Sequence, residues 1–245
     1  MLVPTAPVLQ RLHRTPPMRC PYLPGRTEQQ VFGKLSGPMA QANFEDLSRA
    51  GFRRSHRVAY RPACPECSAC VPVRVLARDF APGRSLRRIR KANADLEATE
   101  LQPVATAAQH RVFAHYLWSR HGDSEMAGMS FEDYRAMVEE TAVDTRLFEF
   151  HEPAGKLVGV MLADWLADGP SAVYSFYDPE SAWRGLGNFM VVWLIERARR
   201  LHLPHVYLGY WIAESPKMSY KTRFRPIEAL GPQGWRLLPV AGDNG

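Results

Sequence analysis

A meander of three strands followed by one long helix is the feature that most constrains how this chain can fold. The strand-like runs are Arg146–His151, Lys156–Leu166 and Ser171–Tyr177. Gly155 and the sequence Asp168-Gly169-Pro170 separate them, and short runs divided by such turn residues predict antiparallel neighbours. A helix from about Arg184 to Leu201 is predicted next, because its apolar residues recur at helical spacing. A sheet with a helix packed on it is therefore expected here.

The elements on either side complete a recognisable order. A helix is predicted over Ala107–Arg120, and Ser130 with Asp133 three residues later is typical of the N-cap of another. A last strand is predicted over His205–Trp211. Helices, an antiparallel meander, a glycine-containing turn into a long helix and a final strand form the order of a GNAT-like N-acyltransferase domain. We therefore predict the α+β class with a mostly antiparallel sheet.

The first half of the chain is expected to form a smaller α/β domain. Residues 1–19 are rich in proline and lack a sustained period, which predicts an irregular lead-in. The stretch around Thr99–Thr106 also loses its period and contains Pro103. We therefore divide the rest into an N-terminal domain, residues 20–104, and a GNAT-like domain, residues 105–245.

Charge and hydropathy narrow the classes of partner. The 245 residues carry a formal net charge of +6, which favours a polyanionic partner, with nucleic acid as the first candidate. No run approaches the roughly 18 apolar residues that a membrane span needs, and the start lacks a basic segment followed by an apolar one. We expect a cytoplasmic protein with no membrane partner.

The four cysteines form one local group in the first third of the chain. Cys64, Cys67 and Cys70 are three residues apart, and Cys20 is a possible fourth ligand. Such spacing can direct several thiolates at one centre, which suits zinc or an iron–sulfur cluster. The alternative is a set of reduced, partly buried thiols beside a binding groove. Both interpretations stay open.

A strongly basic helix is predicted directly after this group, over Arg84–Asn93. Its cations are Arg84, Arg87, Arg88, Arg90 and Lys91. A face of this kind matches a phosphate backbone, although many charged runs are simply solvated. The lack of nearby acidic residues favours a functional role, and we predict that these five side chains bind tRNA.

Two further segments contain residues suited to a site. Arg184-Gly185-Leu186-Gly187 can place a helix N-terminus near a phosphate or an oxyanion, or its glycines can simply permit a tight corner. Tyr207–Ile212 reads as a core strand, and Lys217–Lys221 follows it. Cations and a tyrosine just past a strand end are in a usual position for site residues.

Together these segments resemble the arginyl/leucyl-tRNA–protein transferase family, and within it the bacterial branch that adds leucine to N-terminal aspartate or glutamate. The matching motifs are Cys20–Arg26, Gly51–Ser55, Tyr60–Pro62 with Cys64, Cys67 and Cys70, Arg84–Asn93, Tyr174–Pro179, Leu186-Gly187, Tyr207–Ile212 and Lys217–Lys221. The resemblance runs from about Cys20 to Trp235. It implies an N-terminal domain packed against a GNAT-like domain, a cytosolic role in N-end-rule degradation, and no acetyl-CoA. The implied partners are leucyl-tRNA and proteins with N-terminal Asp or Glu.

The chemistry of that reaction indicates what a site must contain. The donor is an activated ester, and the α-amine nucleophile has an unperturbed pKa of roughly 7.7 to 8.0, so positioning supplies much of the rate and no cofactor is required. A proton acceptor and an oxyanion stabiliser remain to be found. The candidates are Asp178, Tyr177 and Tyr210, in segments that would run side by side in a GNAT-like sheet.

An acidic acceptor also needs cations for its side-chain carboxylate. The candidates, all in the matching motifs, are Arg53, Arg54, Arg61, Lys217, Tyr220 and Lys221. Some of these cations are expected to contact tRNA instead.

Three alternatives stay open on the sequence. The donor can be arginyl-tRNA, since a leucine and an arginine pocket differ by contacts that the sequence does not place. The turn at Arg184–Gly187 also fits a CoA-dependent GNAT acetyltransferase. A non-catalytic nucleic-acid-binding module built on the cysteines would explain the basic helix, but it leaves the second half of the chain without a purpose.

Overall fold

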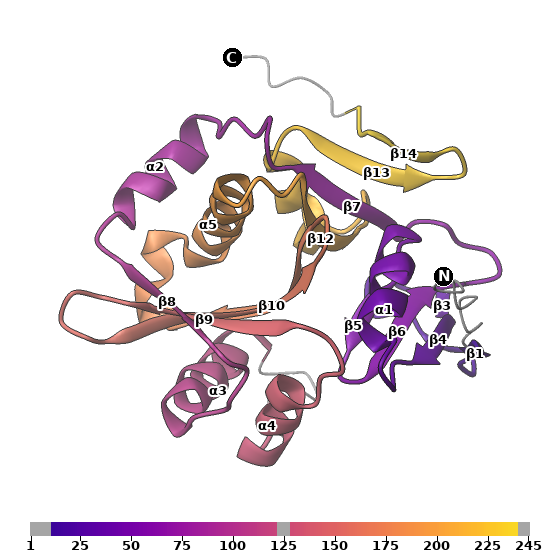
Figure 1. Ribbon diagram of the computed structural model, residues 1–245, viewed down its shortest axis with the longest axis horizontal. Helices are drawn as coiled ribbons and strands as arrows, with labels where there is room; N and C mark the ends of the chain where they lie inside the picture. The colour runs from indigo at the N-terminus through magenta and orange to yellow at the C-terminus, as the bar shows by residue number, and fades with distance from the viewer. Residues whose placement is uncertain (1–10, 122–127, 240–245) are drawn as a thin grey trace, which may run out of the picture.

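The structure is a computed structural model that describes residues 11–121 and 128–239 (Figure 1). Its largest element is an eight-stranded sheet in the order β14-β13-β7-β12-β11-β10-β9-β8. The strands are β7 (Val71–Leu76), β8 (Glu97–Leu101), β9 (Thr145–His151), β10 (Leu157–Leu166), β11 (Gly169–Tyr177), β12 (His205–Trp211), β13 (Ile227–Gly231) and β14 (Gly234–Leu237). Of these neighbours β11 and β12 run parallel and the other pairs antiparallel. The predicted α+β class with a mostly antiparallel sheet is confirmed.

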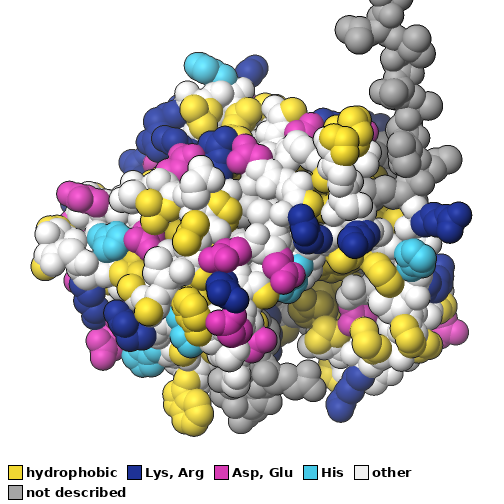
Figure 2. All heavy atoms as spheres, turned by 60° about the horizontal axis from the view of Figure 1, so that its bottom comes forward, with side chains coloured by type: hydrophobic (Ala, Val, Ile, Leu, Met, Phe, Trp, Pro, Cys, Tyr) yellow, Lys and Arg dark blue, Asp and Glu magenta, His cyan; other side chains and the backbone are white. Residues whose placement is uncertain are grey.

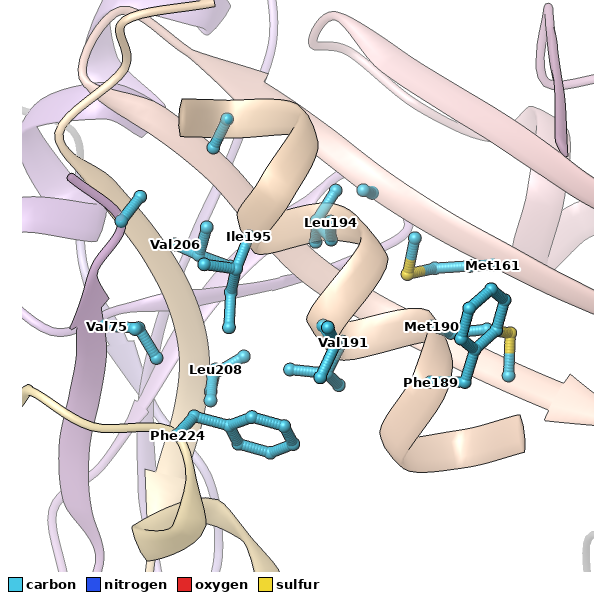
Figure 3. Packing of buried hydrophobic residues seen from close by; sticks show 14 of the residues in the cluster. Val75, Met161, Phe189, Met190, Val191, Leu194, Ile195, Val206, Leu208 and Phe224 are labelled. Carbon is cyan, nitrogen blue, oxygen red and sulfur yellow. The ribbon is translucent and has the colours of Figure 1, made fainter. Parts of the chain in front are cut away.

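The long helix α5 (Leu186–Arg200) covers one face of this sheet. Its apolar side chains pack on β7, β10 and β12, as Figure 3 shows for Ile195 beside Val206 and Met190 near Met161. The basic helix α2 (Arg84–Ala92) lies against α5 on the same side, with Leu86 fully buried. Burial of this continuous apolar surface is the main stabilising term for the fold.

Two helices cover the opposite face of the sheet (Figure 1). These are α3 (Ala107–His121) and α4 (Phe131–Glu139). Phe113 and Tyr134 are buried against Phe176 of β11. Ser130 caps α4, and its side chain and that of Asp133 form a reciprocal capping box. The N-cap that the sequence predicts is confirmed.

A smaller sheet, formed by the N-terminal part of the chain, packs beside the large one. Its order is β1-β4-β6-β5, and β2 and β3 form a separate pair. The strands are β1 (His13–Arg14), β2 (Met18–Arg19), β3 (Thr27–Glu28), β4 (Gln30–Lys34), β5 (Arg53–Ser55) and β6 (Val58–Pro62). Helix α1 (Ala40–Arg49) buries Phe44 here, and Tyr207 and Leu166 of the large sheet belong to the same apolar cluster.

The division that we expected near residue 104 stays a prediction. The large sheet takes β7 and β8 from the N-terminal side of that division and its other strands from the C-terminal side. β7 lies between β12 and β13, so residues from both expected domains share one hydrogen-bonded sheet. Residues 1–10 of the expected lead-in lie outside the described residues. Among the described helices, none is both long enough and apolar enough to cross a membrane.

Candidate functional site

The parallel strands β11 and β12 separate soon after they meet. Ser171 and Tyr207 are their one register pair, and β12 has a bulge between Tyr207 and Gly209. Arg53 of β5 reaches into this region from the small sheet, and its Nη2 donates to the carbonyl oxygens of Ala172 at 2.8 Å and Val173 at 3.2 Å. A predicted acceptor-binding cation is thus fixed at the point where the two sheets meet.

Gly209 makes room for this arginine. Its φ is +72°, a conformation that L side chains rarely adopt, and a Cβ atom there would lie 2.2 Å from Nη1 of Arg53. Both the backbone angle and the contact therefore require glycine. The sequence predicts a core strand here, but it does not reveal that the glycine accommodates a residue from a distant segment.

Tyr210 follows directly and is held by two main-chain carbonyl groups. Its hydroxyl lies 2.9 Å from the oxygen of Gly51 and 3.1 Å from that of Tyr60, and it has one proton to donate between them. Burial raises the pKa of Tyr210, so the phenol stays protonated at neutral pH. The geometry thus gives Tyr210 a clear role in joining β12 to the small sheet.

Lys221 is buried in the 3₁₀ helix η3 (Pro216–Arg223) that follows β12. Its Nζ donates to the main-chain oxygen of Tyr210 at 2.5 Å. Burial, and then the nearby charge of Arg53, lower the pKa of Lys221 to about 7. No carboxylate of the described residues forms an ion pair with this ammonium group. Lys221 can therefore exist as a neutral amine near neutral pH, which its place in a basic motif does not predict.

The other candidates in η3 are on the surface. Lys217 is exposed, and Tyr220 is 38% exposed, with its ring 6.0 Å from Nζ of Lys221. Burial of most of the ring raises the pKa of Tyr220. Arg61 is exposed on β6, and it donates to the main-chain oxygen of Ala50 at 3.0 Å. Tyr220 therefore lies next to a group in which Tyr210 and Lys221 are buried and Arg53 is half-buried.

Arg54 does not belong to this group. The side chain of Arg54 is 1% exposed, and it makes two hydrogen bonds of 2.7 Å to the carboxylate of Asp164 in β10. Thr145 hydrogen bonds to the same carboxylate at 2.8 Å. Neighbouring residues of a strand point to opposite faces. Arg53 therefore faces the point where β11 and β12 separate, while Arg54 faces the interior. The buried ion pair with Asp164 gives Arg54 a structural role, and acceptor binding by Arg54 stays a prediction.

Asp178 and Tyr177 lie at the far end of β11. Lys156 forms an ion pair with Asp178 at 2.7 Å, and the carboxylate accepts a hydrogen bond from the main chain of Glu180. Burial would raise the pKa of Asp178, but the bond from Lys156 and this main-chain bond hold it below its ordinary value. Tyr177 accepts a 2.6 Å hydrogen bond from Arg120. Within the described part of the chain, neither residue hydrogen bonds to Tyr210, so the three expected catalytic residues lie in two separate places.

The five cations of α2 differ in their surroundings. All are exposed, but Arg90 pairs with Glu196 of α5 and Arg87 donates to the carbonyl of Pro82. The side chains of Arg84, Arg88 and Lys91 have no hydrogen bond or ion pair to the described residues. Over the centre of the face that Figure 2 shows, basic and acidic side chains are interspersed. Unpaired cations on one helix are the better match to a phosphate backbone.

Comparison with known proteins decides the family. The family description "Arginine-tRNA-protein transferase, N terminus" matches residues 18–88, and "Arginine-tRNA-protein transferase, C terminus" matches residues 108–231. The chain belongs to the arginine-tRNA-protein transferase family. Among its relatives, the aspartate/glutamate leucyltransferase of Paramagnetospirillum magneticum is 55% identical, with 94% of each chain covered. That of Parvibaculum lavamentivorans is 53% identical, with 93% of this chain and 94% of the relative covered.

The fold of this family member also occurs in a solved structure. The crystal structure of FemX superposes with a TM-score of 0.50 at 9% identity, covering 88% of this chain and 84% of the other. At such low identity the likeness concerns the fold alone. It agrees with the GNAT-like arrangement that the sequence of this transferase predicts.

The cysteines of the transferase lie close enough to influence one another. Burial, followed by the charges of Cys64, Cys20 and Cys67, raises the pKa of Cys70 to about 11. Cys64 exchanges hydrogen bonds with the main chain of Gln29, at 3.5 and 3.6 Å. Within residues 11–121 and 128–239, no three His, Cys, Asp or Glu side chains are placed to hold a metal. The neighbouring thiols are part of the cause of this raised pKa, and a bound cation would lower it, so a metal at these cysteines stays a prediction and we derive no step through it.

The turn before α5 has a packing role in this family member. Gly185 has a φ of +68°, and a Cβ atom there would lie 3.3 Å from Ile89 of α2. The adjacent Arg184 pairs with Asp95 at 2.9 Å. The glycine therefore lets α2 and α5 approach closely. Of the two alternatives for this turn, a phosphate site and a tight corner, this observation favours the tight corner.

Proposed function

We propose that this transferase moves leucine from leucyl-tRNA onto the N-terminal Asp or Glu of proteins in the cytoplasm, and so marks them for N-end-rule degradation. The observation that carries the proposal is the 55% identity to an aspartate/glutamate leucyltransferase over 94% of both chains. The reaction joins the leucyl carbonyl carbon to the acceptor's α-nitrogen, and the ribose oxygen of the tRNA leaves.

The proposed acceptor end of the site is the junction of the two sheets. Arg53 offers a guanidinium held by the carbonyl groups of Ala172 and Val173, and its fixed geometry suits a carboxylate. Arg61, Lys217 and Tyr220 lie on the surface around it and would contact the acceptor chain or the tRNA. The positive charge of Arg53 has no acidic partner here among the described residues, so an acidic N-terminus would complement it.

Lys221 is the proposed proton acceptor. A buried amine with a pKa of about 7 is partly neutral at cellular pH, so its lone pair can take the proton that the α-ammonium group loses on attack. The proton then returns to the leaving ribose oxygen. Tyr210 would position Lys221 through its main-chain oxygen. Asp178, one of the three catalytic candidates from the sequence, is a weaker base because its ion pair with Lys156 lowers the pKa of the carboxyl group.

Tyr177 and Asp178 remain proposed members of the donor side. Tyr177 is a partly exposed phenol beside Tyr116 and Arg120 at the end of β11. A phenol and an arginine together can hydrogen bond to an oxyanion or to the ester of the aminoacyl group. Asp178 would fix this end of the strand through its hydrogen bond to Glu180.

One transfer assay tests the function. Purified protein is mixed with labelled leucyl-tRNA or arginyl-tRNA and with peptides that begin with Asp, Glu, Lys or Ala. We expect label on the Asp and Glu peptides from leucyl-tRNA. Label from arginyl-tRNA alone would show that arginyl-tRNA is the donor in place of leucyl-tRNA. No label from either tRNA would overturn the proposal. Thermal protection by acetyl-CoA would instead favour the acetyltransferase.

A further inference from the structure

A basic cavity of about 690 Å³ lies between the start of α2 and the end of η3. Its polar lining residues are Arg84, Ser85, Arg88, Thr222, Arg223 and Arg225. The two elements are far apart in the sequence, so the fold brings four guanidinium groups to one cavity. Its volume lies within the usual range for ligand sites, roughly 300–1,000 Å³.

The charges of this cavity are not balanced by the protein. Of the residues that the structure describes, no Asp or Glu lines it. The side chains of Arg84, Arg88 and Arg223 have no hydrogen bond or ion pair to the described residues, and Nε of Arg225 donates to the main-chain oxygen of Thr222. Like charges close together cost free energy unless an anion joins them. The cavity is therefore suited to a ligand that carries more than one negative charge.

The main chain at the cavity adds hydrogen-bond donors and a positive dipole end, which also attract anions. α2 begins after Gly83, without a capping side chain and without an acidic residue in its first turn. Its first N–H groups and the positive end of the helix dipole therefore remain available at the cavity. Ser85 and Thr222 contribute hydroxyl groups. Arginines, hydroxyl groups and free N–H groups are the usual donors to phosphate oxygens.

We propose that this cavity binds successive backbone phosphates of the aminoacyl-tRNA, with Arg223 and Arg225 completing a site that α2 only begins. The inference rests on the proposed function, which it extends with residues of η3. Thr222 directly follows Lys221, so the phosphates would be held next to the proposed reaction centre. A tRNA backbone bound in this cavity would direct the 3′ end of the tRNA toward the junction of the two sheets.

The test measures tRNA affinity as a function of salt. Arg223→Ala and Arg225→Ala are compared with the wild type, and Arg200→Ala is the matched control because Arg200 is exposed and has no contact with the cavity. We expect each cavity variant to weaken binding of leucyl-tRNA several-fold at about 100 mM salt. The slope of log K against log salt should become less negative by about 0.7 to 0.9 per lost contact. Arg200→Ala should leave both quantities close to the wild type.

Kinetics provide a second measurement. The cavity variants should raise KM for leucyl-tRNA while KM for the acceptor peptide stays unchanged, and Arg223→Lys should restore part of the loss. Affinity and salt slope equal to the wild type in both alanine variants would overturn the inference. An equal loss in Arg200→Ala would do the same, because it would show a diffuse charge effect.

The outcomes of these experiments distinguish this inference from its alternatives. Thermal protection by CoA that Arg223→Ala abolishes, with tRNA affinity unchanged, would assign the cavity to a nucleotide and overturn the inference. If the wild type transfers leucine and the cavity variants bind tRNA normally, the inference fails alone. If the wild type transfers no amino acid from either tRNA, the proposed function fails, whatever the variants bind.

Discussion

The buried amine of Lys221 makes stability depend on pH. Folding lowers the pKa of this lysine from the ordinary value of 10.5 to about 7, so between these values the unfolded chain holds a proton that the folded chain has released. The free energy of unfolding should therefore rise with pH, by about 1.4 kcal/mol per unit over that interval. Lys221→Met removes this contribution, and urea unfolding at pH 6 to 10 measures it. A methionine variant with the same slope as the wild type would contradict the prediction.

Gly209 tests how closely Arg53 is fitted. Gly209→Ala adds a Cβ atom 2.2 Å from the guanidinium at a φ of +72°, so we expect the loss of Arg53's hydrogen bonds and of most transfer activity. Gly234→Ala is the control, because its φ is +88° but nothing lies within 4 Å of the added atom. The control should lose only the strain of about 1–2 kcal/mol. Equal losses of stability and activity in the two variants would show that Arg53 is not displaced.

At the level of elements, one buried ion pair joins the small sheet to the large one. Asp164→Ala leaves Arg54 buried without its partner, which should cost about 3–5 kcal/mol of unfolding free energy. The double variant Arg54→Met with Asp164→Leu should recover much of that loss. Glu132→Ala, which breaks a surface pair with Arg135, should cost about 0–1 kcal/mol. Urea unfolding distinguishes these cases, and a loss at Asp164 as small as that at Glu132 would contradict the prediction.

The sequence predicts the elements that have a strong apolar period. The meander from β9 to β11, helix α5 and strand β12 match the expected segments within a few residues. The stretch Thr99–Thr106, which is expected to be aperiodic, contains the last three residues of β8, because all five residues of this strand are exposed at the sheet edge. Periodicity reports burial, and an edge strand of this kind has almost none. The turn before α5 forms a separate 3₁₀ helix, η2 (Pro179–Arg184), which delays the start of the α-helix.

The sequence predicts the composition of the site better than its geometry. Arg53 and Arg54 are adjacent in one motif, yet Arg53 reaches β11 and Arg54 reaches Asp164, because their partners come from distant strands. Arg223 and Arg225 join α2 only through the tertiary fold, so no local pattern reveals that they share a cavity. These assignments depend on which strands become neighbours.

For the whole molecule, the shared sheet predicts how the chain can be cut. A fragment of residues 105–245 lacks β7, which pairs with β12 along nearly its entire length, and it also lacks α2. We expect this fragment to show no cooperative thermal unfolding, whereas residues 66–245, which retain both elements, should unfold cooperatively at a lower temperature than the full chain. Circular dichroism follows both transitions. Cooperative unfolding of residues 105–245 at the temperature of the full chain would contradict this expectation.

The central place of β7 also affects biosynthesis. The ribosome releases residues 71–76 early, but the neighbours of this strand are β12 and β13, which are translated more than 120 residues later. For most of its synthesis the nascent chain must keep an apolar strand without partners, and unpaired strands are prone to aggregate. The sheet can therefore close only after residue 231 has left the ribosomal exit tunnel. Slow translation of the last third would lengthen the time that chaperones must protect this strand.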